Sequence, residues 1–414
     1  MDSIQKIKGF ADIFPPESEA FVCLESQARR IFGLYGYKEA RLPILERTEL
    51  FARSIGEETD VVQKEMYTFA DRKGRSITMR PEGTAGMVRA YVENGLHAKE
   101  DLTKLFCTGP MFRYERPQKG RMRQFHQISV EALGLASPLL DVEVIFMLHQ
   151  FLTGLGLVDL NFELNSLGCP ECRPAYLAAL NDYFKGFDAG QLCDDCMRRK
   201  LTNPLRVLDC KVPGCKELTR TAPIIADYQC PACREHFETV TGLLDADGFA
   251  YTLNPRLVRG LDYYIRTTFE VTTGRLGAQS AVAGGGRYDG LVKNLGGPDL
   301  PGVGFACGME RLAMLMGKDA PETPDFFLAM VGDANLNAGL LLAQKLRRAD
   351  FSGECALTAK SAKSQMRQSA KSGARVCLIL GDAEREAGSV VVKDMATGTQ
   401  ENVAQADLIL FLRK

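Results

Sequence analysis

Residues 112–131, FRYERPQKGRMRQFHQISVE, constrain the fold of this chain more than any other stretch. Five cations fall within eleven consecutive residues, and Pro117 and Gly120 divide the stretch into two extended arms around a turn. Gln127 and Glu131 follow on a segment that reads as a strand. A hairpin that brings fixed cations to a phosphate, followed by polar groups that hold a small ligand, is typical of a nucleotide site. A solvated basic loop is the alternative for this stretch taken alone.

The composition is that of an ordinary globular protein with room for two or three domains. The chain has 414 residues, of which 45% are hydrophobic and 25% charged, and a formal net charge of −1. A near-neutral total argues against a chain devoted to nucleic acid, although local basic segments can still bind it. No stretch approaches the roughly 18 apolar residues of a membrane span, and the N-terminus lacks the apolar core of a signal peptide. We therefore expect a cytoplasmic protein with no membrane contact and with reduced thiols.

Eight of the thirteen cysteines are spaced in close pairs between positions 169 and 233. The pairs are Cys169 with Cys172, Cys193 with Cys196, Cys210 with Cys215, and Cys230 with Cys233. Two sulfurs on one tight turn supply half of a tetrahedral shell, so the spacing indicates structural zinc. We expect one four-thiolate site, from Cys210, Cys215, Cys230 and Cys233. Cys193 and Cys196 could replace one of these pairs, or form a second site with Cys169 and Cys172. The alternative is that all eight are small buried apolar side chains.

The order of predicted elements indicates an α+β domain that is interrupted by the cysteine-rich stretch. Helices are expected at 17–37, 83–95 and 139–155, and strands at 40–45, on both sides of a turn within 68–78, at 104–112 and at 251–273. Because strand-like patterning resumes after the cysteines, residues 170–245 are expected to be an insertion into a larger domain formed by 1–169 and 246–317. A proline-containing linker, 318–325, precedes residues 326–414, which alternate strand and helix like a small α/β domain.

Three segments resemble the motifs of class II aminoacyl-tRNA synthetases. Phe112–Glu115 stands as the FRxE core of motif 2, and Gly302–Arg311, GVGFACGMER, resembles motif 3, a glycine-rich strand that enters a helix. Pro43, on its expected strand, fits motif 1, the dimer-forming element. The resemblance implies an antiparallel-sheet catalytic domain in 1–169 and 246–317.

Within that class the chain is similar to the histidyl-tRNA synthetases of bacteria. Arg259–Tyr264, RGLDYY, and Ala283–Asp289, AGGGRYD, look like the two signatures of this family, and Arg80–Thr84, RPEGT, completes the set. The similarity runs over essentially the whole chain, and residues 326–414 match the family's anticodon-binding domain. It implies ATP-dependent ligation of L-histidine to its tRNA through a histidyl-adenylate, with Mg²⁺ on the phosphates, and a homodimer.

The resemblance also implies roles for the charged residues. Arg113 and Arg259 would be the catalytic residues, bracketing the α-phosphate of ATP and the attacking histidine carboxylate. Arg121 and Arg311 would grip the outer phosphates, and Glu115 would accept a hydrogen bond from the adenine amino group. No protein nucleophile is needed, since the reaction requires that two anions be positioned and developing charge be neutralised.

The expected histidine site combines acceptors for the ammonium group with partners for both edges of the imidazole. Its members are Glu82, Gly83, Thr84, Arg113, Gln127, Glu131, Arg259, Tyr263, Tyr264 and Tyr288. Glu131 and Tyr264 would pair with the ring nitrogens, while Tyr263 and Tyr288 would line the walls. The alternatives are that Glu131 pairs with a nearby arginine and that Tyr263 only packs in the core.

Two regions are expected to contact tRNA. One helix face of the C-terminal domain carries a basic stripe of Lys360, Lys363, Arg367 and Lys371. Gln118 and Arg123, in the basic hairpin, could approach the acceptor end. A solvated face is the alternative for the stripe. The alternative for the whole chain is a catalytically inactive paralogue that binds histidine as a regulatory subunit of a histidine-biosynthesis enzyme.

Overall fold

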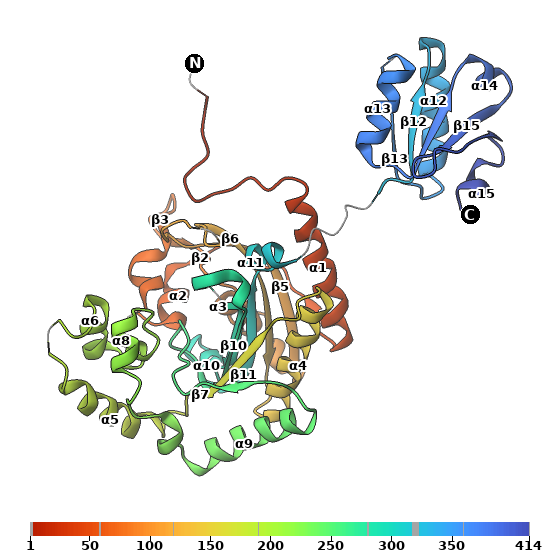
Figure 1. The fold of residues 1–414 in the computed structure, drawn as a ribbon. Helices are drawn as coiled ribbons and strands as arrows, with labels where there is room; N and C mark the ends of the chain where they lie inside the picture. The colour runs from red at the N-terminus through yellow and green to blue at the C-terminus, as the bar shows by residue number, and fades with distance from the viewer. Residues whose placement is uncertain are drawn as a thin grey trace. The chain divides into compact units, whose positions relative to one another are not determined.

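The computed structural model describes residues 3–57, 59–118, 120–188, 190–279, 281–316, 323–358 and 360–413. The chain divides into two compact units, Met1–Gly317 and Lys318–Lys414 (Figure 1). Most of the linker expected at 318–325 lies outside the described residues. Among the helices that are described, none is both long and apolar enough to cross a membrane.

An eight-stranded sheet forms the centre of the first unit. In spatial order its strands are β1 (Lys38–Glu39), β5 (Thr103–Phe112), β6 (Gln124–Leu133), β11 (Gly302–Gly308), β10 (Ala281–Arg287), β9 (Ile265–Thr272), β7 (Asn161–Ser166) and β8 (Thr252–Leu253). The outermost pairs, β1 with β5 and β7 with β8, are parallel, and all the inner pairs are antiparallel. The predicted α+β class with an antiparallel-rich sheet is therefore confirmed.

Three helices cover one face of this sheet with a continuous apolar core: α1 (Glu17–Leu34), α4 (Pro138–Gly154) and α9 (Pro231–Ala246). The ring of Phe32 lies 5.2 Å from that of Phe151 on α4 and 5.9 Å from that of Phe305 on β11. Helix α4 begins where its sequence predicts, because the Ser137 hydroxyl accepts a hydrogen bond from the Leu139 N–H and Pro138 occupies the first helical position. Helix α3 (Thr84–Glu93) belongs to a second core together with Tyr288 and the insertion.

The strand predicted at 40–45 is wrong. Residues 38–39 pair with β5, while Leu45–Arg47 (β2) pairs with Ser76–Met79 (β4) in a separate three-stranded sheet. The chain passes from one sheet to the other around Pro43, whose nitrogen has no hydrogen to donate to a ladder. The two strands predicted around the Asp71–Gly74 turn are confirmed as Tyr67–Ala70 (β3) and β4.

The strand predicted at 251–273 is interrupted. Only β8 and β9 are extended, and residues 254–264 form a turn-rich segment between them. Side chains from elsewhere hold this segment, since Asn165 donates to the Leu257 carbonyl at 3.0 Å and Arg206 donates to the Gly260 carbonyl at 2.6 Å. The alternation of residue types in this stretch therefore does not indicate a continuous strand. It reflects contacts of the 254–264 segment with side chains from other parts of the chain.

The insertion is helical. After β7 it comprises α5 (Arg173–Lys185), α6 (Asp194–Thr202), α7 (Leu205–Leu208), α8 (Pro213–Leu218) and a 3-10 turn (Ile225–Tyr228), and it returns to the sheet through α9. Helix α6 contacts the part of the first unit outside the insertion. Arg199 contacts the carboxylate of Asp60 at 2.9 Å, and Arg198 donates to the Gln63 side chain at 2.9 Å. Asp60 and Gln63 lie at the turn after α2 (Thr48–Ile55).

The second unit is a five-stranded sheet with helices, as its alternating pattern predicts. Its strands are, in spatial order, β13 (Gly353–Cys355), β12 (Phe326–Met330), β14 (Val376–Leu380), β15 (Ser389–Asp394) and β16 (Gln400–Ala404). The helices are α12 (Leu336–Arg347), α13 (Ala362–Ser372), α14 (Asp382–Glu386) and α15 (Leu408–Leu412). Strand β16 is mostly exposed, which explains why apolar patterning does not reveal it.

A fully buried ion network joins the sheet to the helices. The guanidinium of Arg287 on β10 and the carboxylate of Asp141 on α4 have no solvent exposure, and Arg287 Nε donates to Asp141 at 2.9 Å. His236 on α9 contacts the other carboxylate oxygen at 2.6 Å. Although burial opposes ionisation, the His236 hydrogen bond and the Arg287 charge hold the pKa of Asp141 below its ordinary value. Arg287 also donates to the Leu135 and Ser137 carbonyls.

Replacing Arg287 with leucine should therefore destabilise the catalytic unit by about 3–5 kcal/mol, because Asp141 would keep a buried charge without its main partner. Urea unfolding followed by circular dichroism measures the change. Lys293→Met removes an exposed ion pair with Asp299, whose side chains are 63% and 66% exposed, and should cost less than about 1 kcal/mol. Equal effects of the two variants would contradict the importance of the buried network.

Candidate active site

A pocket of 450 Å³ opens in the catalytic unit where several of the sequence motifs meet. This volume is within the range of about 300–1,000 Å³ that small-molecule sites occupy. The predicted site residues that line it are Glu82, Thr84, Arg113, Glu115, Arg121, Gln127, Arg259, Tyr263, Tyr264 and Arg311. They come from α3, the β5–β6 hairpin, the 254–264 segment and α11 (Met309–Leu315), so the fold brings together residues more than 200 positions apart.

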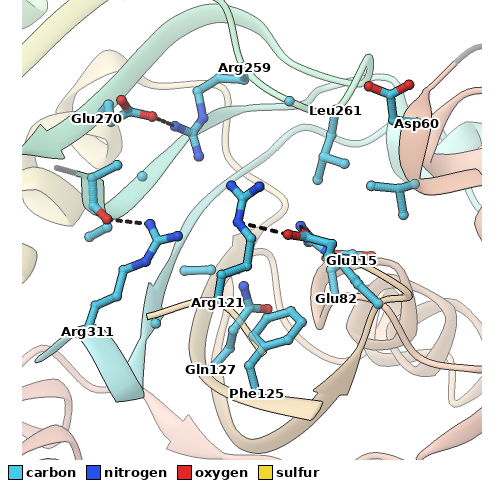
Figure 2. Close-up of a pocket in the computed structure, with 18 of the residues that line it drawn as sticks. Asp60, Glu82, Glu115, Arg121, Phe125, Gln127, Arg259, Leu261, Glu270 and Arg311 are labelled. Carbon is cyan, nitrogen blue, oxygen red and sulfur yellow. Dashed lines mark hydrogen bonds and ion pairs between the residues drawn. The ribbon is translucent and has the colours of Figure 1, made fainter. Parts of the chain in front are cut away.

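Arginine side chains dominate the charge of this pocket. Figure 2 shows the guanidiniums of Arg121, Arg259 and Arg311 directed into the same open space. Each is oriented by an acceptor, since Arg121 Nε lies 2.8 Å from Glu115, Arg259 Nη1 donates to Glu270 at 2.7 Å, and Arg311 Nη1 donates to the Ala281 carbonyl at 2.6 Å. The nitrogens that these contacts leave unused on Arg121 and Arg259 can bind an oxyanion.

Arg113 is fixed in the same way, and its Nη1 lies 3.9 Å from Glu115, the partner of Arg121. The Nε of Arg113 donates to the Pro81 carbonyl at 2.9 Å, and its guanidinium lies 5.3 Å from the centre of the Phe125 ring. Burial, with Arg121 nearby, lowers the pKa of Arg311. Four preorganised guanidiniums around one space, two of them close enough to repel, form a site whose electrostatic energy improves when a polyanion enters.

Glycines in the central strands make room for the polar side chains of the site. A Cβ atom at Gly284 on β10 would lie 2.4 Å from the Arg259 guanidinium, and one at Gly304 on β11 would lie 2.2 Å from the Glu131 carboxylate. At Gly285 a Cβ atom would collide with the neighbouring strand, 2.1 Å from the Gly304 carbonyl. The glycine run is therefore a strand in which side chains are excluded, and not a turn.

Glu131 and Tyr288 lie behind the pocket wall rather than on it. Glu131 is 1% exposed, and its two oxygens accept hydrogen bonds from the Thr84 hydroxyl, at 2.6 Å, and from the Tyr288 hydroxyl. Burial raises the pKa of Glu131 to about 8. Tyr263 lines the pocket with its ring 5.7 Å from that of Tyr288, so it does not only pack in the core.

The residues expected to accept hydrogen bonds from an ammonium group differ in whether their acceptor atoms already have partners within the protein. Glu82 is buried, and its carboxylate accepts from the backbone N–H groups of Thr84 and Ala85 at 2.7 and 2.8 Å, at the start of α3 after Gly83. Burial raises the pKa of Glu82. In contrast, Gln127 Oε1 is buried with no hydrogen-bond partner among the described residues. Gln127 is therefore the acceptor that most requires a ligand.

The two hairpin residues expected to approach tRNA are placed differently. Gln118 is exposed at the turn, where its backbone pairs with Arg121. Arg123 is engaged within the protein, because its guanidinium lies 3.8 Å from the Tyr114 ring centre and donates to the Glu115 carbonyl at 3.2 Å. Lys119, between them, lies outside the described residues.

Several pocket residues were not predicted from the sequence. Phe125 shares the strand face of Gln127, so the period-two pattern of β6 could have revealed it. Glu270 on β9 is recognisable only once its ion pair with Arg259 is seen. Arg206 and Lys211 reach the pocket from the insertion, and no local sequence signal connects them with it.

The cysteines form two groups of four, and the predicted grouping is wrong. Cys210 and Cys215 lie with Cys193 and Cys196, whereas Cys230 and Cys233 lie with Cys169 and Cys172. In each group the four sulfurs lie within 4.8 Å of one another. The alternative second site, Cys193 and Cys196 with Cys169 and Cys172, is wrong for the same reason. The first pair thus meets the fourth across the helices of the insertion, while the second pair meets the third.

In the second unit, the basic stripe of α13 faces solvent. Lys363, Arg367 and Lys371 are exposed on the helix, and its opposite face buries Gln365 and Ser369. Lys360 is also exposed, but it precedes the helix, so its predicted place on the helix face is wrong. Gln365 fixes the helix to β12, since it exchanges hydrogen bonds with the backbone of Met330. The stripe is thus a rigid exposed surface, as a nucleic-acid contact requires.

Comparisons of the sequence and of the structure with known proteins point to the same family. A family model described as Histidyl-tRNA synthetase matches residues 9–312, and one described as Anticodon binding domain matches residues 325–414. The histidine–tRNA ligase of Solidesulfovibrio magneticus is 65% identical over 413 residues, covering 100% of this chain and 98% of that protein. That of Nitratidesulfovibrio vulgaris (strain Hildenborough) is 61% identical over 98% of this chain and 97% of that protein. The apo crystal structure of S. aureus histidyl-tRNA synthetase superposes with a TM-score of 0.83 at 35% identity and covers 100% of both chains.

The raised pKa of Glu131 leads to a stability prediction. The folded state keeps a proton up to about pH 8, whereas an unperturbed carboxyl loses it near 4.5, so rising pH through this interval destabilises the folded wild-type chain. Glu131→Gln removes this titration. The melting temperature of the variant minus that of the wild type should therefore increase from about pH 5 to about pH 8. A difference that stays constant over this range, measured by scanning calorimetry, would contradict the assignment.

Proposed function

The chain belongs to the histidyl-tRNA synthetase family and is a histidine–tRNA ligase, and we propose that the arginine-lined pocket of its catalytic unit is where histidine is activated. The observation that carries this proposal is the convergence of Arg113, Arg121, Arg259 and Arg311 on one pocket. Its substrates are histidine, ATP and tRNA.

In the first step a carboxylate oxygen of histidine attacks the α-phosphorus of ATP. A new P–O bond forms, the bond to the bridging oxygen of the β-phosphate breaks, and pyrophosphate leaves with the electron pair. Arg113 and Arg259, which both line the pocket, hold the carboxylate and the α-phosphate in line and neutralise the charge that builds on phosphorus. Arg121 and Arg311 bind the outer phosphates, and Glu115 accepts from the adenine amino group.

Magnesium is expected with ATP, and the acidic groups of the pocket fit this role. Among the described residues, no three carboxylates converge on one point; only the cysteines form such groups. This suits Mg²⁺, which takes most of its ligands from substrate phosphates and water and one or two from carboxylates. Glu270, which is paired with Arg259 at the pocket, is the side chain that could hold it, and the ion would supply further neutralisation of phosphate charge.

Histidine would be selected by buried hydrogen-bonding groups. The unpartnered Oε1 of Gln127, together with Glu82 and Thr84, would accept from the ammonium group. The imidazole would lie beside Tyr263 and Tyr264, with Glu131 and Tyr288 behind. A site built from buried polar partners rejects a side chain that cannot pair with them, often by about 10⁴. Binding of an isosteric apolar amino acid would leave those groups without partners.

In the second step the terminal ribose hydroxyl of tRNA attacks the acyl carbon of the adenylate and AMP leaves. We propose that residues 326–414 bind the anticodon region, with the exposed α13 stripe as a phosphate-contacting surface. Gln118 is the hairpin residue with access to the acceptor end. Arg123 is proposed in a supporting role for that contact, because it braces the hairpin through Tyr114.

Two further features complete the proposal. The paired thiols of the insertion are proposed to bind zinc as a structural metal, because soft thiolate ligands favour it. A cytoplasmic location is proposed, since zinc–thiolate chemistry and free cysteines both fit a reducing compartment.

The regulatory-paralogue alternative is not favoured. Curated relatives that match over the full chain are named histidine–tRNA ligase. The four pocket arginines and the second unit are also present, and a protein that only senses histidine has no use for them.

We propose a homodimer formed around the three-stranded sheet. Ile44, Leu45 and Phe69 are 40%, 49% and 47% exposed there, which is a concentration of apolar surface next to Pro43. Light scattering at micromolar concentration should give twice the chain mass of 45.6 kDa. A particle of 45.6 kDa under those conditions would contradict the dimer.

The proposed activation step predicts histidine-dependent exchange of pyrophosphate into ATP by the wild-type chain. Arg259→Ala should lower the exchange rate by about 10²–10³, because one preorganised charge is lost from the transition state. Gly284→Ala should also lower it strongly, since the new Cβ would lie 2.4 Å from Arg259.

Gly290→Ala is the matched control, because a Cβ there meets nothing within 4 Å. Exchange that survives Arg259→Ala unchanged would move the reaction away from this pocket. Equal effects of the two glycine variants would contradict the proposed close approach of β10 to Arg259.

A further inference from the structure

The eight thiols of the insertion form two sites of different position. The group of Cys169, Cys172, Cys230 and Cys233, here the proximal site, joins the end of β7 to the start of α9. The group of Cys193, Cys196, Cys210 and Cys215, the distal site, joins α6 to the turn before α8 and to α8 itself. Each site therefore connects two parts of the insertion that are separated in the chain, within the apolar cluster that surrounds the sulfurs.

The sulfur spacing matches a tetrahedral thiolate–zinc centre. In the proximal site Cys169 Sγ lies 3.6 Å from Cys172 Sγ and 3.9 Å from Cys230 Sγ. In the distal site Cys193 Sγ lies 3.8 Å from Cys210 Sγ. With a Zn–S bond of about 2.3 Å, the edge of a regular tetrahedron is about 3.8 Å. These three distances match that edge, and all four sulfurs of each site lie within 4.8 Å of one another.

Backbone N–H groups point at the sulfurs in both sites. The N–H of Cys230 donates to Cys172 Sγ at 3.1 Å, and the N–H of Cys193 donates to Cys215 Sγ at 3.2 Å. Such donors stabilise the thiolate form and fix the direction of its lone pairs toward a metal. The same arrangement in two unconnected groups is difficult to explain as the packing of small apolar side chains.

The distal site is linked to the catalytic pocket. Between its ligands Cys196 and Cys210 lies Arg206, which lines the pocket and donates to the Gly260 carbonyl at 2.6 Å. Asn203, also between them, donates to the Asp262 carboxylate at 3.1 Å. Gly260 and Asp262 belong to the segment that carries Arg259, Tyr263 and Tyr264 into the pocket. The position of these site residues thus depends on a short segment whose two ends are distal-site ligands.

We propose that the insertion holds two structural zinc ions, and that the distal ion positions Arg206 against the 259–264 segment and thereby supports histidine binding. Arg206 is a positioning residue in this account, since it acts through the backbone of Gly260. The metal sites stand on the thiol geometry alone, while the link to histidine rests on the proposed function of the pocket.

The metal sites are tested first, by elemental analysis of the full chain purified without chelators. Two zinc ions per chain are expected. The pair Cys210→Ser with Cys215→Ser should leave one ion, and so should Cys230→Ser with Cys233→Ser. Cys355→Ser, outside both groups, should leave two. If the wild type held one ion per chain and both double variants held none, the two-site arrangement would be overturned. The result would instead indicate a single site built from Cys210, Cys215, Cys230 and Cys233.

A second measurement protects this test against variants that do not fold. The wild-type chain is exchanged into Co²⁺, which should give the ligand-to-metal charge transfer and the intense visible bands of tetrahedral thiolate coordination at two ions per chain. Absence of these bands in a chain that remains folded by circular dichroism would overturn both sites.

The link to the pocket is tested by a double-mutant cycle on histidine affinity, measured by calorimetry. Arg206→Met should raise the Kd of the wild type about tenfold. The same Arg206→Met substitution should raise the Kd for histidine by less than about twofold when it is introduced into the variant Cys193→Ser with Cys196→Ser. That variant has already lost the positioning of Arg206. Effects that multiply, or a distal-site variant that binds histidine like the wild type, would overturn the link.

The outcomes separate the two proposals. A wild-type chain that binds two zinc ions but no histidine would overturn the proposed function of the pocket, and with it the link, while the metal sites would stand. A chain that binds histidine but no zinc would leave the proposed function in place and overturn the inference.

Discussion

The architecture of the catalytic unit depends on one buried charge and its compensation. Arg287, on a central strand, has no contact with solvent, and its donors are taken by Asp141 and by the Leu135 and Ser137 carbonyls ahead of α4. His236 brings α9 to the same carboxylate. Since an uncompensated charge in this interior would cost several kcal/mol, sheet and helices are held in one relative position. The glycine-rich strands that shape the pocket are fixed by the same network.

That fixed position has a chemical consequence on the other side of β10. In the strand that ends in Arg287 the three preceding residues, 284–286, are glycines, so that Gly284 lets Arg259 lie directly on the sheet. Arg259 is then oriented by Glu270 and joins the other guanidiniums around the pocket. A rigid arrangement of charges needs no reorganisation when an anionic ligand binds, which is the property that electrostatic catalysis requires.

Much of the fold could be predicted from the sequence, and so could part of the pocket. Long periodic segments such as α1, α4 and the β5–β6 pair were confirmed, because local patterning and burial agree there. Sequence motifs identified ten of the residues that line the pocket. The strand predicted at 40–45 was wrong, because the chain changes from one sheet to another around Pro43. The strand predicted at 251–273 is interrupted at 254–264, where side chains from distant parts of the chain hold the backbone and no local pattern predicts them.

The sequence by itself determined the class of fold, the chemistry of the site and the presence of paired thiols, because these depend on residue types and their order. Only the tertiary structure decided which thiols meet, that Glu131 is a buried carboxyl behind the pocket, and that Arg206 reaches it from the insertion. These features arise from contacts between segments far apart in the chain. Their energies depend on burial and distance, and both exist only once the chain has folded.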